Sequence, residues 1–272
     1  MTASITKDTQ LCMSLAGRPS NIGTRFHNYL YAELGLDFVY KAFTTTDIVA
    51  AVGGIRALGI RGCGVSMPFK EAVIPLMDSM DGSATVIASV NTIVNDGGRL
   101  TGYNTDYTAV ATLLQDHQVP TDSDFALIGS GGMAKAVVAA LRDGGFTDGV
   151  VVARNQTTGP ALARQYGFGW VRDLGDRRPR LVVNATPVGM SGGPASGDLP
   201  VPKSVVDAAE TVFEVVAMPE VTPLVDRAQE AGLRVITGTE VIALQAAAQF
   251  ALYTGVRPTP EQVARAGDYA RG

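Results

Sequence analysis

The chain is poor in cysteine and histidine, with two of each among 272 residues. Two cysteines are too few for a disulfide framework, and neither Cys12 nor Cys63 lies near a histidine at a spacing typical of metal ligands. The sequence therefore predicts no metal site. It also predicts that both cysteines are reduced and buried as small apolar side chains.

Charge is also sparse: charged residues make up 18% of the chain, and the net charge is −4. This balance offers no electrostatic basis for binding nucleic acid or an anionic membrane surface, so local groups must hold any anionic ligand. No apolar run approaches the length of a membrane span, and residues 1–10 lack the apolar core of a signal peptide. We expect a cytoplasmic monomer or homodimer that acts on a small molecule.

What the chain does have is length and alternation. It is longer than one hydrophobic core comfortably accommodates, which predicts two domains. Short apolar runs typical of strands alternate with helical patterns, which favours parallel sheets covered by helices. The predicted α/β domains are a substrate-binding domain at 1–106 and a Rossmann-type, doubly wound dinucleotide-binding domain at 107–238. C-terminal helices at 239–272 are expected to return to the first domain, and Asn-Asp-Gly-Gly at 95–98 predicts a hairpin.

A glycine-rich stretch at 129–132 follows an apolar run and precedes a helical pattern rich in alanine and valine. Strand, glycine turn and helix in this order are typical of the turn that cradles a dinucleotide's pyrophosphate. Gly129 would permit the turn, Gly131 would let the backbone approach the phosphates, and Ala134 would let the helix pack near the strand. The helix N-terminus would supply free N–H groups and the positive end of its dipole.

The end of the next predicted strand indicates which dinucleotide is preferred. NAD sites usually carry an acidic residue there, which accepts a hydrogen bond from the ribose 2′-hydroxyl. Here Arg154 and Asn155 stand at that place, and a guanidinium can pair with a 2′-phosphate. We therefore expect NADP in preference to NAD, although a solvated surface arginine is the alternative interpretation of Arg154.

Lys70 and Asp106 each follow a predicted strand, which is where open α/β sheets place their ligands. A lysine beside a carboxylate can relay the proton that a hydroxyl loses when it is oxidised. Spacing alone does not show that the two residues meet. For either one alone, a solvated charge is the alternative.

Seven short motifs resemble those of the shikimate dehydrogenases, in the family's order and along nearly the whole chain. They lie at 65–70, 90–92, 104–106, 129–132, 184–190, 222–224 and 245–247. The resemblance implies NADP-dependent hydride transfer that interconverts shikimate, or a related cyclic hydroxy acid, and its 3-dehydro form within aromatic amino acid biosynthesis. It also implies that Lys70 is the proton-relaying base and Asp106 its partner.

The resemblance further implies two sets of ligand contacts. The substrate would be bound by Ser66, Asn91, Asp106 and Gln245. The cofactor would be surrounded by Gly129, Ser130, Gly131, Gly132, Met133, Ala134, Arg154, Asn155, Thr186, Val215 and Gly238.

The chain departs from the family pattern where the substrate carboxylate is expected to bind. Asn21 and Gly23 stand in place of two serines, Gly64 in place of an asparagine, and Ala217 in place of a tyrosine. The missing hydroxyls predict weaker carboxylate binding unless other residues replace them. The candidates for replacement are Ser14, Ser20, Asn21 and Thr24.

These departures are similar to those of the shikimate dehydrogenase-like subgroup, and they leave the substrate open. One alternative is a dehydrogenase for quinate or another hydroxy acid. The other is a nucleotide sensor without turnover, against which the presence of both Lys70 and Asp106 argues.

Overall fold

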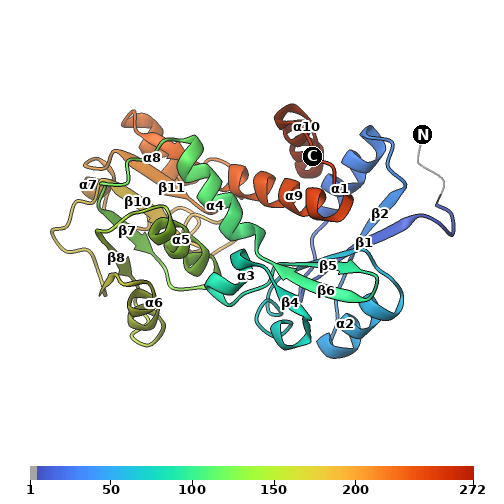
Figure 1. Ribbon diagram of the computed structural model, residues 1–272. Helices are drawn as coiled ribbons and strands as arrows, with labels where there is room; N and C mark the ends of the chain where they lie inside the picture. The colour runs from blue at the N-terminus through green and yellow to red at the C-terminus, as the bar shows by residue number, and fades with distance from the viewer. Residues whose placement is uncertain (1–4) are drawn as a thin grey trace. The chain divides into compact units, whose positions relative to one another are not determined.

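The computed structural model describes residues 5–272. The chain folds into two compact units. The first takes in the chain up to Thr105 together with Ala243–Gly272, and the second is Asp106–Ile242. Each unit has its own six-stranded sheet with helices against it (Figure 1). The predicted α/β class, with a doubly wound Rossmann-type sheet in one of two domains, is confirmed.

The sheet of the first unit has the strand order β2-β1-β3-β5-β6-β4. β1 runs parallel to β2 and β3, whereas β5 runs antiparallel to both β3 and β6. The sheet is therefore mixed, and the parallel arrangement expected from the alternation of strands and helices holds for β1, β2 and β3. Its strands are β1 (Gln10–Leu15), β2 (Phe38–Phe43), β3 (Gly62–Val65), β4 (Ser79–Met80), β5 (Thr92–Asp96) and β6 (Arg99–Tyr103).

The hairpin predicted at 95–98 joins β5 to β6. Gly97 and Gly98 have φ values of +60° and +94°, in the left-handed region that glycine enters without steric cost. Two antiparallel steps, from β3 to β5 and from β5 to β6, make β3 and β6 parallel to each other. The carboxyl ends of β3 and β6 therefore lie at the same edge of the sheet.

The strand register divides the side chains of this sheet between two hydrophobic cores. Cys12 lies opposite Tyr40 and Gly62, and this face packs against α1, α10 and the later part of α9. Cys63 belongs to the core on the other face, with α2. Both cysteines are buried and free, as predicted. The helices are α1 (Ile22–Glu33), α2 (Ile48–Ala57), η1 (Ile74–Leu76), α3 (Gly82–Ile87), α9 (Gly238–Thr254) and α10 (Pro260–Arg271).

The sheet of the second unit is parallel throughout, in the order β12-β11-β10-β7-β8-β9. The chain starts at the central β7, moves outward through β8 and β9, and then returns to β10 on the other side of β7. This is the doubly wound order, and its switch point lies between β7 and β10. Its strands are β7 (Phe125–Ile128), β8 (Gly149–Val152), β9 (Gly169–Val171), β10 (Leu181–Asn184), β11 (Thr211–Glu214) and β12 (Arg234–Ile236).

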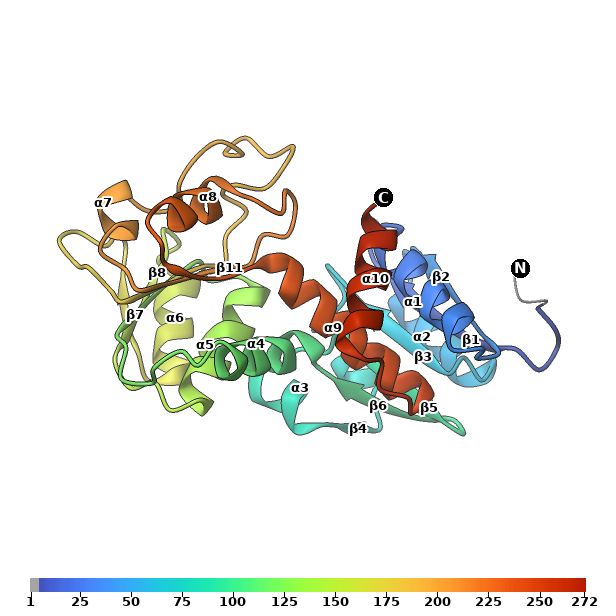
Figure 2. The same cartoon turned by 90° about the horizontal axis from the view of Figure 1, so that it is seen from above.

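Helices cover both faces of this second sheet, with α5 and α6 on one side and α7 and α8 on the other (Figure 2). All residues of β7, β10 and β11 are buried, as expected of central strands covered on both faces. No helix within residues 5–272 is long and apolar enough to cross a membrane. The helices are α4 (Thr105–Asp116), α5 (Gly132–Asp143), α6 (Thr158–Tyr166), α7 (Lys203–Val206) and α8 (Pro223–Glu230).

Capping residues set where several helices begin. The Asp47 carboxylate accepts the N–H of Ala50 at 2.9 Å and starts α2. Thr237 and Glu240 form a reciprocal pair that starts α9, because Glu240 accepts the Thr237 N–H at 2.7 Å and Thr237 Oγ1 accepts the Glu240 N–H at 3.4 Å. Thr259 starts α10 in the same way. These caps fix the first turn of each helix.

Candidate functional site

The turn between β7 and α5 has the geometry of a phosphate-binding loop. Gly129 has a φ of +118°, and a Cβ built on it would lie 2.9 Å from the carbonyl oxygen of Ala185. Only glycine fits this position without a shift of backbone. The turn therefore packs closely against the loop after β10, at the switch point where doubly wound sheets bind dinucleotides.

The first turn of α5 leaves its backbone N–H groups open to a ligand. Gly131 is the N-cap residue in an extended conformation, and within the described chain no side chain caps the helix. A Cβ at Gly131 or Gly132 would meet no described atom within 4 Å. Ala134, by contrast, is fully buried and lets α5 lie close to the sheet. This first turn suits a pyrophosphate, because free N–H groups and the helix dipole both favour an anion.

The loop after β8 lies beside this turn. The hydroxyls of Ser130 and Thr158 are 2.7 Å apart, which joins the two loops. Asn155 Oδ1 accepts the N–H groups of Thr157 and Thr158 at 2.9 and 3.0 Å and starts α6. Arg154 is exposed on this loop and forms no ion pair with any residue in 5–272. Its guanidinium is therefore available to an anionic group such as a phosphate.

The loop after β10 is held by a buried amide and a buried acid. Asn184 Nδ2 donates to Glu214 Oε1 at 2.9 Å, and Asn184 Oδ1 accepts from Thr186 Oγ1 at 2.6 Å. Glu214 also accepts the N–H of Val216 and the hydroxyl of Thr222, each at 2.9 Å. Burial raises the pKa of Glu214 to about 7, although these donors oppose the shift. The pair fixes the loops that carry Thr186 and Val215.

Gly238, the first residue of α9, packs against the chain at the carboxyl end of β11. A Cβ there would lie 2.4 Å from the carbonyl of Val216 and 2.6 Å from the carbonyl oxygen of Val215. The helix N-terminus can approach the end of β11 only because residue 238 is glycine. The predicted cofactor residues, including the half-buried Met133, follow five strands (β7, β8, β10, β11 and β12) and therefore lie at one edge of the sheet.

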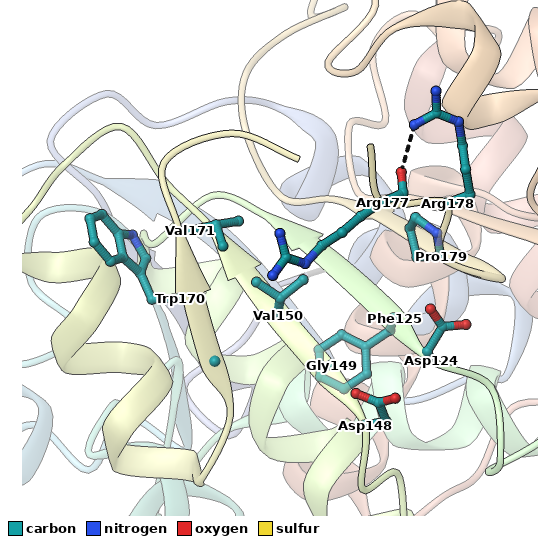
Figure 3. A pocket seen from close by; sticks show the side chains of 11 residues that line it. Asp124, Phe125, Asp148, Gly149, Val150, Trp170, Val171, Arg177, Arg178 and Pro179 are labelled. Carbon is teal, nitrogen blue, oxygen red and sulfur yellow. Dashed lines mark hydrogen bonds between the residues drawn. The ribbon is translucent and has the colours of Figure 1, made fainter. Parts of the chain in front are cut away.

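A cavity of about 330 Å³ lies at the opposite edge of the same sheet (Figure 3). Phe125 and Gly149 in its lining are the first residues of β7 and β8, so it opens at the amino ends of the strands. The side chain of Arg177 extends over Val150 in this view (Figure 3). Doubly wound sheets bind their ligands at the carboxyl ends, so this cavity is separate from the cofactor site.

In the first unit, backbone hydrogen bonds hold the segment from Ser66 to Lys70 at the end of β3. Ser66 N–H donates to Leu15 O at 2.9 Å, Phe69 N–H to Ser66 O at 2.9 Å, and Val90 N–H to Lys70 O at 2.9 Å. The exposed Ser66 and the half-buried Lys70 therefore have a fixed backbone. They leave the sheet at the edge where β3 and β6 both end.

Asn91 connects this segment to the chain that follows β6. It is 2% exposed, and its side chain accepts the Thr105 N–H at 2.8 Å and donates to Thr105 Oγ1 at 3.0 Å. Asp106, buried in the first turn of α4, comes directly afterwards. The predicted Lys70 and Asp106 thus follow two parallel strands that end at the same sheet edge, as their positions after strands suggest.

Two of the polar residues at this edge were not predicted. Gln249 is 5% exposed and donates to Thr92 Oγ1 at 2.9 Å and to Asn91 O at 3.2 Å. It lies one helical turn beyond the predicted Gln245, which is half-buried. The spacing of the two glutamines was a usable signal, because residues four apart share one face of a helix. Thr105 is the second unpredicted residue.

The candidates to replace the missing hydroxyls lie at and before the first turn of α1. Asn21 is the exposed N-cap residue of α1, and its side chain makes no capping hydrogen bond with any described residue. Ser20 is also exposed. Thr24 Oγ1 is buried, with no hydrogen-bond partner in the part of the chain that the structure describes. Binding of the carboxylate by these residues stays a prediction.

Neither a metal nor a histidine base is supported at these sites. No group of three or more His, Cys, Asp or Glu side chains within residues 5–272 could hold a metal ion. His27 is fully buried, and burial lowers its pKa to about 3. The imidazole is neutral at working pH and stacks on Tyr40, with ring centroids 4.4 Å apart.

Comparison with known proteins shows the family of the chain. Residues 21–93 match the family model described as the shikimate dehydrogenase substrate binding domain. A shikimate dehydrogenase-like protein from Haemophilus influenzae is 53% identical over 267 residues, covering 98% of each chain.

Two solved structures share the fold of the whole chain. A shikimate 5-dehydrogenase from Thermus thermophilus, in complex with NADP(H) and shikimate, has a TM-score of 0.86 and 29% identity, covering 96% of this chain and 99% of its own. A quinate dehydrogenase from Corynebacterium glutamicum, in complex with NAD, has a TM-score of 0.87 and 26% identity, covering 96% and 98%. The chain belongs to the shikimate dehydrogenase family, in its shikimate dehydrogenase-like subgroup.

Proposed function

We propose that the protein is an NADP-dependent oxidoreductase that interconverts shikimate, or a related cyclic hydroxy acid, and its 3-dehydro form. The observation that carries the proposal is the placement of Lys70 and Asp106 after β3 and β6, two parallel strands that end at one sheet edge. The relatives named as NADP-dependent shikimate dehydrogenases support the same reaction, for example the Archaeoglobus fulgidus protein at 36% identity.

The second unit supplies the residues that would hold NADP. Backbone N–H groups of Gly131 and Gly132 would bind the pyrophosphate, and Arg154 would bind the 2′-phosphate. Thr186 and Gly238 would border the nicotinamide end, on the loops that Asn184 and Glu214 fix. When bound, NADP would supply the acceptor for the hydride that leaves the carbon carrying the reacting hydroxyl.

The residues after β3 and β6 supply the proton chemistry. As the hydride leaves the carbon, the Lys70 amine takes the hydroxyl proton, and the C–O bond becomes a carbonyl. The Asp106 carboxylate accepts a hydrogen bond from Lys70 and from the substrate. Asn91 keeps the segment before Asp106 in place through its two hydrogen bonds to Thr105. Ser66 and Gln245 would bind the remaining hydroxyl groups.

A different hydroxy acid, such as quinate, is the second candidate substrate. Asn21 and Gly23 carry no hydroxyl at the first turn of α1, and the quinate dehydrogenase shares the fold. In either case we expect a monomer or homodimer that acts in the cytoplasm, without nucleic acid or membrane partners. This location agrees with two buried, free cysteines.

The proposal is tested by turnover with a panel of cyclic hydroxy acids, each supplied with NADP and with NAD. Shikimate with NADP should give the highest kcat/KM. A higher value for quinate would support the second substrate. Binding of NADP without turnover of any panel member would contradict the proposal and favour a nucleotide sensor.

A further inference from the structure

The Tyr40 side chain reaches the sheet edge where the substrate would bind. Tyr40 lies on β2 opposite Cys12, which pairs with Gly62 on β3, but the Tyr40 hydroxyl lies near Gly64, two residues closer to the carboxyl end of β3. A Cβ built on Gly64 would lie 3.0 Å from Tyr40 Oη and 3.5 Å from the Cβ of Ser14. Gly64 itself lies opposite Ser14 in the pairing of β1 with β3. The phenol hydroxyl therefore occupies the space that a side chain at residue 64 would fill.

The same hydroxyl lies below the first turn of α1. A Cβ built on Gly23 would be 3.8 Å from both Tyr40 Oη and Tyr40 Cε1. Gly23 is the second residue of α1 and has no side chain to offer a ligand. Tyr40 thus places a hydroxyl between the first turn of α1 and the end of β3, where the sequence lacks one.

Several contacts fix the position of Tyr40. Asn28 Nδ2 donates to Tyr40 O at 2.8 Å, and Tyr40 N–H donates to Asn28 Oδ1 at 2.9 Å. This pair of bonds ties the middle of β2 to α1. His27 stacks on the phenol ring with an interplanar angle of 12°. The hydroxyl is therefore held in place before a ligand arrives, which reduces the entropy lost on binding.

The chemistry of the hydroxyl suits an anion. Burial raises the pKa of Tyr40 far above its usual value, so the group stays protonated and can donate a hydrogen bond. The Ser14 side chain borders the same space, because its Cβ lies 3.5 Å from the Cβ position of Gly64 and Tyr40 Oη lies 3.0 Å from that position. Gln249 Nε2, 3.5 Å from the Cβ position of Gly64, connects this pair to Thr92 and Asn91.

We infer that the Tyr40 hydroxyl, with that of Ser14, binds the carboxylate of the substrate and so makes the site selective for an acid. The inference rests on the proposed function, whose substrate is a cyclic hydroxy acid. It assigns a donor for the carboxylate on a strand rather than on the loop before α1. Glycine at residue 64 leaves room for the phenol, because a Cβ there would already lie 3.0 Å from Tyr40 Oη.

The test compares shikimate with its methyl ester, whose carboxyl group carries no charge. Calorimetry would measure the affinity of the wild-type protein, Tyr40→Phe and Tyr31→Phe for each compound. Tyr31 is a matched control, because it is a buried phenol in the same core, about 12 Å further along α1 than Gly23. Tyr40→Phe should weaken shikimate binding about ten- to a hundredfold and weaken ester binding much less, because the neutral ester carbonyl accepts a weaker hydrogen bond than the carboxylate does. Tyr31→Phe should leave both unchanged.

Two further variants keep the test decisive. Gly23→Ser in the Tyr40→Phe background should restore part of the affinity for the acid, because a Cβ at residue 23 meets only ordinary contacts. Gly64→Ala should give a smaller loss of the same kind if Tyr40→Phe does not fold, since its Cβ would lie 3.0 Å from Tyr40 Oη and force the hydroxyl to shift.

Unchanged shikimate affinity in Tyr40→Phe, or equal weakening of acid and ester, would overturn the inference. So would a wild-type protein that does not bind shikimate. Calorimetry needs no turnover, so a wild-type protein that binds the acid but oxidises nothing would contradict the proposed function alone.

Discussion

Glu214 shows how one buried side chain can couple stability to pH. Its carboxyl group is fully buried at the end of β11 and accepts hydrogen bonds from Asn184, Val216 and Thr222. Its pKa of about 7 lies above the ordinary value of 4.5. Between these two values the folded state binds more protons than the unfolded state does. The contribution to stability is therefore full below about pH 4.5 and is lost as the pH rises through 7.

We predict that Glu214→Gln removes this pH dependence. The free energy of unfolding of the wild-type protein should fall between pH 5 and pH 8 by on the order of 3 kcal/mol more than that of the variant. Denaturant titrations at the two pH values would measure the difference. Parallel pH profiles for the two proteins would show that Glu214 does not titrate in this range.

Alanine should affect stability and NADP affinity differently at Gly129 and at Gly131. Gly129→Ala should lower both stability, by about 1–3 kcal/mol, and NADP affinity, because its φ is positive and its Cβ would meet Ala185. Gly131→Ala should lower NADP affinity with little change in stability, since its Cβ meets only open space. Thermal unfolding and calorimetric NADP titration would separate the two effects. Equal losses of stability in the two variants would contradict this account of the turn.

At the scale of elements, the loop between β8 and α6 should set the choice of cofactor. Arg154 lies on this loop, and the Ser130–Thr158 hydrogen bond joins the loop to the glycine turn. Arg154→Ala should weaken NADP binding about tenfold or more and leave NAD binding unchanged, because only NADP carries the 2′-phosphate. Arg164→Ala, at the far end of α6, is the control. The same loss for NADP and NAD would argue against a contact with the 2′-phosphate.

Elements defined by local sequence were predictable, whereas pairings between distant strands were not. The glycine turn after β7 and the hairpin at 95–98 depend on residues next to each other, so their patterns predicted them. The antiparallel pairing of β5 with β3 depends on which strands meet in space. Nothing in the apolar run of β5 indicates its direction.

Some site residues could likewise be predicted from local sequence, whereas others depend on how distant strands pair. Lys70 and Asp106 follow strands, which made them recognisable as candidates, whereas Asn91 was a candidate only through the family resemblance. Tyr40 has the appearance of an ordinary strand residue, and only the register of β1, β2 and β3 brings its hydroxyl to Gly64. Glu214 was likewise missed, although an acid that ends a wholly buried strand is a signal that a sequence can offer.

At the scale of the whole molecule, the residues proposed to hold NADP belong to one unit, whereas Lys70, the proposed base, lies at the sheet edge of the other. The two functions should therefore be separable by mutation. A change at Lys70 should abolish chemistry and leave the cofactor site intact, because the residues proposed to hold NADP all belong to the second unit.

Hydride transfer by Lys70→Ala tests most directly whether Lys70 is the base. The variant should bind NADP with wild-type affinity, while kcat for shikimate oxidation falls by about two to four orders of magnitude. Lys41→Ala, which removes an exposed lysine on β2, should retain wild-type turnover. Wild-type turnover in Lys70→Ala, with NADP binding intact, would contradict the assignment of Lys70 as the base.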